Sequence, residues 1–175
     1  MRFNAMLRDM NVGVPAGDGR RIEVLAQDLP CSGGAQLAVD ATLRSALGAS
    51  GEARARAADH DGAILEQARE DKEDTYPELL ESRRCRLVVM AIETGGRWSD
   101  EAANMVWQLA LVKAQEAPPF MRRAVALGWE RRWTRLLSTT CAVAFASCLS
   151  APARTTQCDW DTGCSPPTCC EVLAC

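Results

Sequence analysis

The run CRLVVMAIE, residues 85 to 93, constrains the fold most strongly. Its residues are almost continuously apolar, and two glycines follow it after Thr94. A run of this length and composition predicts a buried central strand. The chain is therefore expected to contain a sheet, with its remaining strands and its helices supplied by the segments on either side.

Two further strands are predicted upstream of that run. The first covers residues 20 to 29 and the second residues 35 to 44, and the turn PCSGG between them indicates a hairpin. The second strand alternates apolar and polar residues, with Asp40 in its middle. Water satisfies this carboxylate if the polar face is open. If both faces are covered, an ionised carboxylate is costly unless a metal ion, a cation or hydrogen bonds compensate it.

Helical patterns account for most of the other segments. Residues 2 to 10 are expected to form the end of a short helix, and residues 61 to 75 a polar helix. Ser99 is a candidate N-cap for a third helix. A last long helix is predicted over about residues 120 to 149. Its apolar part, 136 to 149, is too short for a membrane span and predicts a buried helix.

The order helix, strand, strand, helix, strand, helix, helix predicts an α/β (α+β) domain with a small mixed sheet flanked by helices. We expect this domain to span residues 1 to 150. The remainder, 151 to 175, is a Cys-rich, irregular segment without the Cys-x-x-Cys spacing of a zinc site, and it is expected to be disordered.

Two observations bear on location. The N-terminus has no apolar signal-peptide core. Four cysteines lie inside apolar segments, as reduced core cysteines do: Cys31, Cys85, Cys141 and Cys148. The sequence therefore predicts a nuclear or cytoplasmic protein that is neither secreted nor held in a membrane.

The chain offers few residues for catalysis. Its single histidine, His60, lies in a charged linker and is expected to be solvated, which excludes Ser-His-Asp and Cys-His catalysis. Arginine outnumbers lysine by 18 to 2, so Lys72 on the polar helix stands out, because lysine can give up a proton and arginine cannot. The chemistry that remains is that of metal-dependent nucleases, in which two carboxylates bind Mg²⁺ beside a lysine.

Four segments carry a family resemblance: RIE (21 to 23), AVDATL (38 to 43), KEDTYPEL (72 to 79) and RLVVMAIETGG (86 to 96). In this order they resemble the restriction-endonuclease-like domain of non-LTR retrotransposon polyproteins, which lies downstream of the reverse transcriptase. The likeness spans roughly residues 2 to 149. It implies a restriction-endonuclease-like fold whose N-terminal segment is truncated here.

The resemblance also implies a set of site residues. Glu23 and Asp40 match the family's two metal-binding acids, for Mg²⁺ or Mn²⁺. Lys72 and Tyr76 match its Lys-x-x-Lys-Tyr helix, and Glu93 matches its strand-end glutamate. Two departures stand out, because a glutamate replaces the family's first aspartate and a threonine replaces the second lysine of the helix motif.

DNA-binding candidates lie in the last helix, where Trp129 and Trp133 are predicted to be core residues. The candidates are its arginines: Arg122, Arg123, Arg131, Arg132 and Arg135. Arginines of this kind contact phosphates, and a solvated basic face is the alternative.

Two hypotheses follow. In the first, the chain is a Mg²⁺-dependent endonuclease domain that nicks duplex target DNA for a retroelement, with the reverse transcriptase as a partner. In the second, it is a catalytically inactive remnant or an interaction module that retains the fold. The side chains of Glu23, Asp40 and Lys72 should converge under the first hypothesis and diverge under the second.

Overall fold

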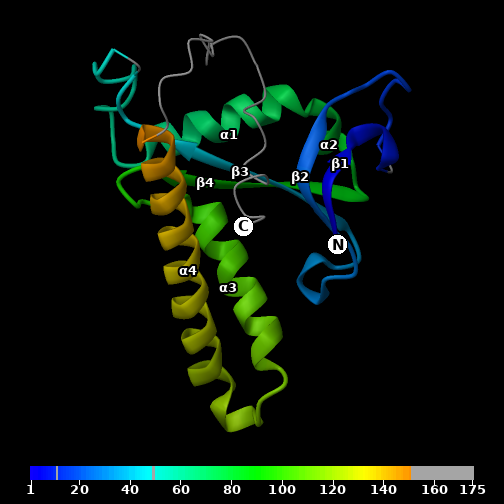
Figure 1. The fold of residues 1–175 in the computed structure, drawn as a ribbon. Coiled ribbons are helices and arrows are strands. Elements are labelled where there is room, and N and C mark those ends of the chain that lie inside the picture. Colours follow the sequence, from blue (N-terminus) through cyan, green and yellow to red (C-terminus); the bar gives the residue numbers. More distant parts are fainter. Residues whose placement is uncertain (11, 49, 151–175) are drawn as a thin grey trace.

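The computed structural model describes residues 1–10, 12–48 and 50–150, and it shows one four-stranded sheet with helices on both faces (Figure 1). The strands are β1 (Arg2–Met6), β2 (Arg21–Ala26), β3 (Gln36–Arg44) and β4 (Cys85–Glu93). The α-helices are α1 (Ala63–Thr75), α2 (Pro77–Glu81), α3 (Asp100–Ala114) and α4 (Arg122–Ser150). Three short 3₁₀ turns are η1 (Leu7–Asp9), η2 (Pro30–Ser32) and η3 (Pro119–Met121). The prediction of an α/β domain with a mixed sheet flanked by helices is confirmed.

The strands lie side by side in the order in which they occur in the chain. β1 with β2 and β2 with β3 pair antiparallel, and β3 pairs parallel to β4. In this register Val24 lies opposite Val39, and Asp40 lies beside Val89. The parallel step follows from the crossover through α1 and α2, because two parallel strands cannot be joined by a tight turn. The hairpin predicted from 20 to 29 and 35 to 44 is confirmed.

The prediction of a helix over residues 2 to 10 is wrong. Residues Arg2–Met6 form β1, and only the short η1 turn that follows is helical. Ala5 pairs with Ile22 of β2. A single isolated helical turn gains little, because helix nucleation is unfavourable, whereas a strand added to the open edge of β2 gains a row of backbone hydrogen bonds.

β4 is a strand as predicted, but it lies at the edge of the sheet instead of its centre. Helices cover both of its faces, and its outer edge is also protected. The Ser99 backbone N–H donates to the Ala91 carbonyl at 3.0 Å, and the Glu101 carboxylate accepts from the Val89 N–H at 3.1 Å. The continuous apolar run therefore indicates that both faces of β4 are buried, but it does not indicate whether the strand is central or at the edge of the sheet.

Two apolar cores hold the layers together. On one face, Leu65 and Ala68 of α1 pack with Leu87 of β4, in a cluster that also includes residues of α2 and of the N-terminal segment. On the other face, Met105 of α3 packs against Leu37 and other sheet residues. The two faces of β3 therefore meet different helices, and the face that carries Asp40 meets α1.

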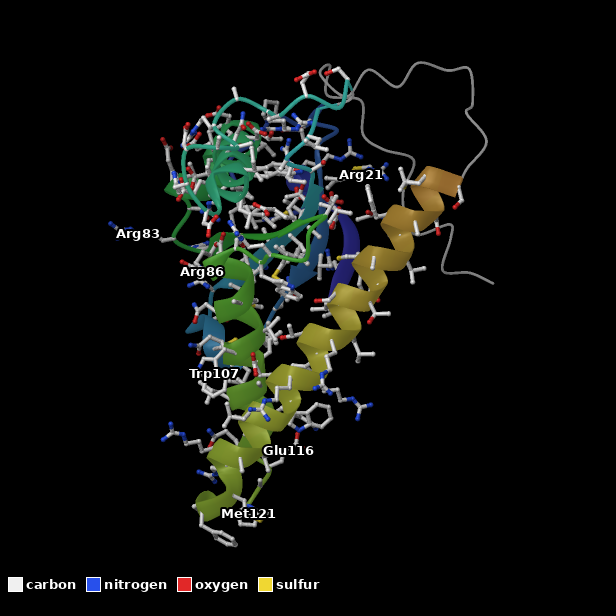
Figure 2. All side chains as sticks on the ribbon, turned by 90° about the vertical axis from the view of Figure 1, so that its left-hand side faces the viewer. Arg21, Arg83, Arg86, Trp107, Glu116 and Met121 are labelled. Atoms are coloured by element: carbon white, nitrogen blue, oxygen red, sulfur yellow. The ribbon has the colours of Figure 1, made fainter. Side chains whose placement is uncertain are left out.

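α3 and α4 form a helical hairpin that projects from the sheet (Figures 1 and 2). Ser99 caps α3 as predicted, its Oγ accepting from the Ala102 N–H at 3.2 Å. The prediction that residues 136 to 149 form a buried helix is wrong: Leu136 and Val143 are 55% and 60% exposed. Among the described α-helices, α4 makes its extensive contacts with α3, so most of its apolar residues have a partner on one side only.

The prediction that the two tryptophans of α4 are core residues is wrong for the same reason. Trp129 and Trp133 are half-buried and lie against each other, with ring centroids 5.2 Å apart, instead of entering a core. Of the four cysteines expected to be core residues, Cys85 is buried, which raises the pKa of its thiol to about 11, and Cys148 is exposed.

No helix in the described ranges is long and apolar enough to cross a membrane. The predicted tail, 151 to 175, lies outside the described residues.

Candidate functional site

Asp40 is a buried charge in the middle of the sheet. Its exposed fraction is 3%, and it is the only polar or charged residue that is buried in the described part of the chain. The possibility that water satisfies this carboxylate is therefore excluded. An ionised aspartate in this position needs a compensating partner inside the protein.

Lys72 of α1 is that partner. Its Nζ lies 3.0 Å from Asp40 Oδ1, and its side chain is 24% exposed. Lys72 follows Ala68 by one helical turn, so it lies on the stripe of α1 that packs on the sheet. The amphipathic pattern of α1 thus aims the ammonium group at the buried carboxylate.

Glu23 of β2 lies next to this ion pair. The pairing of Val24 with Val39 places Glu23 beside the Asp40 position, and the Glu23 Oε2 accepts from the Ala41 N–H at 2.9 Å. Surrounding protein desolvates the carboxylate and raises its pKa above the ordinary value, although the side chain keeps solvent access; the Asp40 charge raises it further. The charge of Lys72 acts in the opposite direction. Glu23, Asp40 and Lys72 therefore form one electrostatically coupled group, called the carboxylate cluster below.

Tyr76 closes one side of the carboxylate cluster. It is buried, and its hydroxyl donates to the Arg21 carbonyl at 2.8 Å, which ties the end of α1 to β2. Burial raises the pKa of Tyr76, and the negative charge of Asp40 adds to this effect. The phenol therefore stays protonated at neutral pH and serves to position the helix.

Two arginines that the sequence analysis missed hold α1 over the carboxylate cluster. Arg44 of β3 lies 2.5 Å from the Asp71 carboxylate, one residue before Lys72. Arg20 donates to the Thr75 carbonyl, three residues after Lys72, and lies 2.6 Å from the Glu78 carboxylate. Arg44 follows Asp40 by four strand positions, so their side chains point to the same face. That spacing is the sequence signal by which Arg44 could have been found.

Glu93 does not join the carboxylate cluster. It pairs with Arg44, four residues beyond the Val89–Asp40 pair, which places it about 13 Å away along the strands. Its backbone N–H donates to the Arg97 carbonyl at 2.8 Å. The structure therefore separates this predicted catalytic residue from Glu23, Asp40 and Lys72.

The predicted DNA-binding arginines fall into two groups. Arg122 donates to the Ala117 carbonyl at 3.1 Å, and the Arg132 guanidinium lies 5.4 Å from the Trp129 ring centroid. The other group is exposed and follows one side of α4 over about 18 Å. It consists of Arg123, Arg131 and Arg135, and is called the arginine stripe below. α4 runs alongside α3, and its first half, which carries the stripe, projects from the side of the sheet opposite α1, so the stripe and the carboxylate cluster lie on opposite sides (Figure 1).

The donor atoms of the carboxylate cluster suit a small hard cation. Residues 1–10, 12–48 and 50–150 contain no group of three or more His, Cys, Asp or Glu side chains able to enclose a metal ion. Mg²⁺, however, commonly takes one or two protein carboxylates and keeps several waters. Glu23 and Asp40 therefore fit an open Mg²⁺ or Mn²⁺ site and do not fit a closed structural one.

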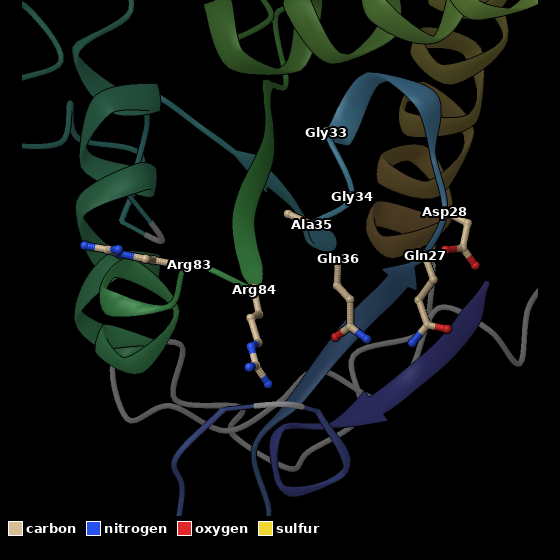
Figure 3. A pocket seen from close by; sticks show the side chains of 8 residues that line it. All are labelled: Gln27, Asp28, Gly33, Gly34, Ala35, Gln36, Arg83 and Arg84. Carbon is tan, nitrogen blue, oxygen red and sulfur yellow. The ribbon is translucent and has the colours of Figure 1, made fainter.

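A hollow of about 500 Å³ lies elsewhere, where β2 ends and β3 begins (Figure 3). The side chains of Gln27, Gln36 and Arg84 point the same way into it, whereas that of Arg83 points away. No residue of the carboxylate cluster lines this hollow. The candidate site is thus a charged position under α1 and is separate from this hollow.

Comparison of the chain with protein-family models, with curated proteins and with solved structures finds no match. The function is therefore inferred from the geometry of the carboxylate cluster and from its chemistry.

Proposed function

We propose that this protein is a Mg²⁺- or Mn²⁺-dependent DNA endonuclease with a restriction-endonuclease-like fold, and that Glu23, Asp40 and Lys72 carry the hydrolysis of the phosphodiester. The observation that carries this proposal is the buried Asp40 carboxylate with the Lys72 ammonium at 3.0 Å and Glu23 on the adjacent strand. A buried ion pair is weak as a stabilising device, since apolar residues of similar size often do as well. Its presence in a small core favours a chemical role.

Each residue of the cluster has a role that its position allows. Glu23 and Asp40 would hold the ion, which when bound supplies positive charge and lowers the pKa of coordinated water. Lys72 neutralises Asp40 and lies where it can hold or exchange a proton, a task that arginine cannot perform at working pH. Tyr76 ties the end of α1 to β2 and thereby keeps Lys72 at a fixed distance from the sheet.

The arginine stripe supports the choice of DNA as the substrate. Its guanidinium groups are exposed along one side of α4 and can contact successive phosphates. Because the stripe lies across the sheet from Asp40, it would hold DNA that flanks the cleaved position. In the full proposal the domain nicks duplex target DNA for a retroelement, in the nucleus or cytoplasm, with the reverse transcriptase as its partner.

A second candidate is a fold that no longer catalyses. The observation that favours it is again the ion pair, because Lys72 compensates Asp40 without any metal ion. This candidate predicts that divalent ions neither bind at the carboxylate cluster nor promote cleavage.

Nicking of supercoiled plasmid separates the two candidates. The purified chain in Mg²⁺ or Mn²⁺ should convert the plasmid to open circles, and EDTA or Asp40→Asn should abolish this. Lys72→Arg should reduce the rate sharply, whereas Lys113→Arg should not, because Lys113, the only other lysine, pairs with Glu116 at the surface. Equal cleavage by wild type and Asp40→Asn would refute the proposal.

A further inference from the structure

The tip of the α3–α4 hairpin presents an exposed aromatic side chain. Phe120 is 87% exposed, the highest fraction among the large apolar residues of the described ranges. Pro118 and Pro119 fix the backbone before it, and the Met121 N–H closes the turn on the Pro118 carbonyl at 2.9 Å. The backbone that carries Phe120 is therefore restrained by a stiff turn, and its ring is exposed to solvent.

The tip stands well away from the sheet (Figure 2). α4 is tied to the sheet side of the molecule at Ser138, whose Oγ accepts from the Trp98 indole N–H at 3.2 Å. From Ser138 to the start of α4 at Arg122 the helix runs for about 24 Å. A partner can thus reach the tip without meeting the body of the domain.

The charge around the tip is positive, although the chain as a whole is not. Residues 113 to 135 contain six basic and two acidic residues, a net charge of +4. The whole chain carries −3, so the other residues together carry −7. Glu116, one of the two acids, pairs with Lys113 at 2.7 Å. The hairpin end is therefore complementary to a polyanion.

We infer that this tip is a wedge that inserts Phe120 into a base step of duplex DNA while the arginine stripe contacts the flanking phosphates. The choice of DNA as the polyanion rests on the proposed function. Apolar side chains flanked by basic residues unstack base steps in this way. An apolar groove of about 500 Å³ behind the tip, lined in part by Trp107, Leu111 and Leu127, offers a displaced base a stacking wall.

The arrangement fits DNA better than a lipid surface. A helix that lies in a membrane interface presents a long apolar face opposite its basic face. At the tip the exposed large apolar side chains are Phe120 and Met121, and Arg122 and Arg123 follow them directly; the exposed apolar residues Leu136 and Val143 lie in the other half of α4, away from the tip. Basic residues on either side of one or two apolar side chains can contact the phosphates that border a DNA groove.

The experiment measures base unstacking with a duplex oligonucleotide that carries 2-aminopurine, in EDTA so that no cleavage occurs. Wild type should raise the 2-aminopurine fluorescence at saturating protein. Phe120→Ala should lose this rise and bind DNA about tenfold more weakly, the loss expected for one stacked aromatic ring. Leu136→Ala, an equally apolar change on an exposed part of α4, should behave as wild type.

Further variants separate this inference from the proposed function. Asp40→Asn should keep the full fluorescence rise, because the wedge needs no hydrolysis. The double variant Arg131→Gln, Arg135→Gln should lower the salt dependence of log Kd by about 1.8, since each phosphate contact contributes about 0.9. The inference is overturned if wild type binds the duplex without a fluorescence rise, or fails to bind it. It is also overturned if Phe120→Ala leaves DNA binding intact but removes binding to vesicles of anionic lipid.

Discussion

The ion pair between Lys72 and Asp40 can be tested by a double-mutant cycle on stability. Lys72→Met keeps the length of the side chain but leaves the Asp40 carboxylate, 4% exposed, without its cation. Removing one partner of a buried pair costs about 3–5 kcal/mol, and we expect about 3 kcal/mol because Lys72 retains some solvent access. For a chain of this size that loss lowers Tm by about 6–12 °C.

The reverse change should be much milder. Asp40→Asn removes the buried charge, and Lys72, which is 24% exposed, can turn its ammonium toward water. The double variant Asp40→Asn, Lys72→Met should therefore resemble Asp40→Asn alone, which corresponds to an interaction energy of about 3 kcal/mol, the whole cost of Lys72→Met. Urea denaturation followed by far-UV circular dichroism measures each free energy of unfolding. An interaction energy below about 0.5 kcal/mol, the limit for independent sites, would show that Lys72 does not compensate Asp40.

Three further changes test the surroundings of the cluster. Glu23→Gln should stabilise the protein at pH 8, because the raised pKa means that the folded state disfavours the charged carboxylate. Since Glu23 becomes protonated in both states as pH falls below its ordinary pKa of 4.5, that gain should vanish in urea denaturation near pH 4. Tyr76→Phe removes the hydrogen bond to Arg21 and should lower the free energy of unfolding by about 1 kcal/mol. An unchanged free energy of unfolding would show that this hydrogen bond does not hold α1 to β2. Arg44→Gln should slow plasmid nicking with a stability loss under about 1 kcal/mol, whereas the exposed Arg86→Gln should alter neither.

The elements with strong local patterns were predictable from the sequence. β3 and β4 followed from alternation and from a continuous apolar run, and the N-cap of α3 followed from Ser99. These signals are local: each depends on neighbouring residues whose side chains meet the same environment. The resemblance to a nuclease family also pointed to Lys72 and Asp40, which lie far apart in the sequence and meet in the structure.

The predictions that were wrong concern elements whose structure depends on partners that are distant in the sequence. β1 becomes a strand because β2 offers it an edge, and nothing within residues 2 to 6 reports that edge. The apolar half of α4 has the composition of a buried helix, yet the extensive contacts of α4 are with α3 on one side. Hydrophobic composition shows what a segment can bury and does not show whether a surface is present to bury it.

The same limit applied to the site. The resemblance grouped Glu93 with Asp40, but the parallel register of β3 and β4 sets them four residues apart. Conversely, Arg20 and Arg44 were missed because an arginine side chain is usually solvated, and only the placement of α1 and α2 shows which carboxylates they meet. Register and helix placement, which single-sequence patterns do not report, decided both outcomes.

Metal binding by the purified chain tests the central claim most directly. Calorimetric titration with Mn²⁺ should show one ion bound per wild-type chain, with binding lost in Asp40→Asn and weakened in Glu23→Gln. Glu93→Gln, which changes a carboxylate outside the carboxylate cluster, should bind Mn²⁺ as wild type does. No binding at millimolar Mn²⁺, or equal binding by wild type and Asp40→Asn, would contradict the assignment of Glu23, Asp40 and Lys72 as a metal-dependent site.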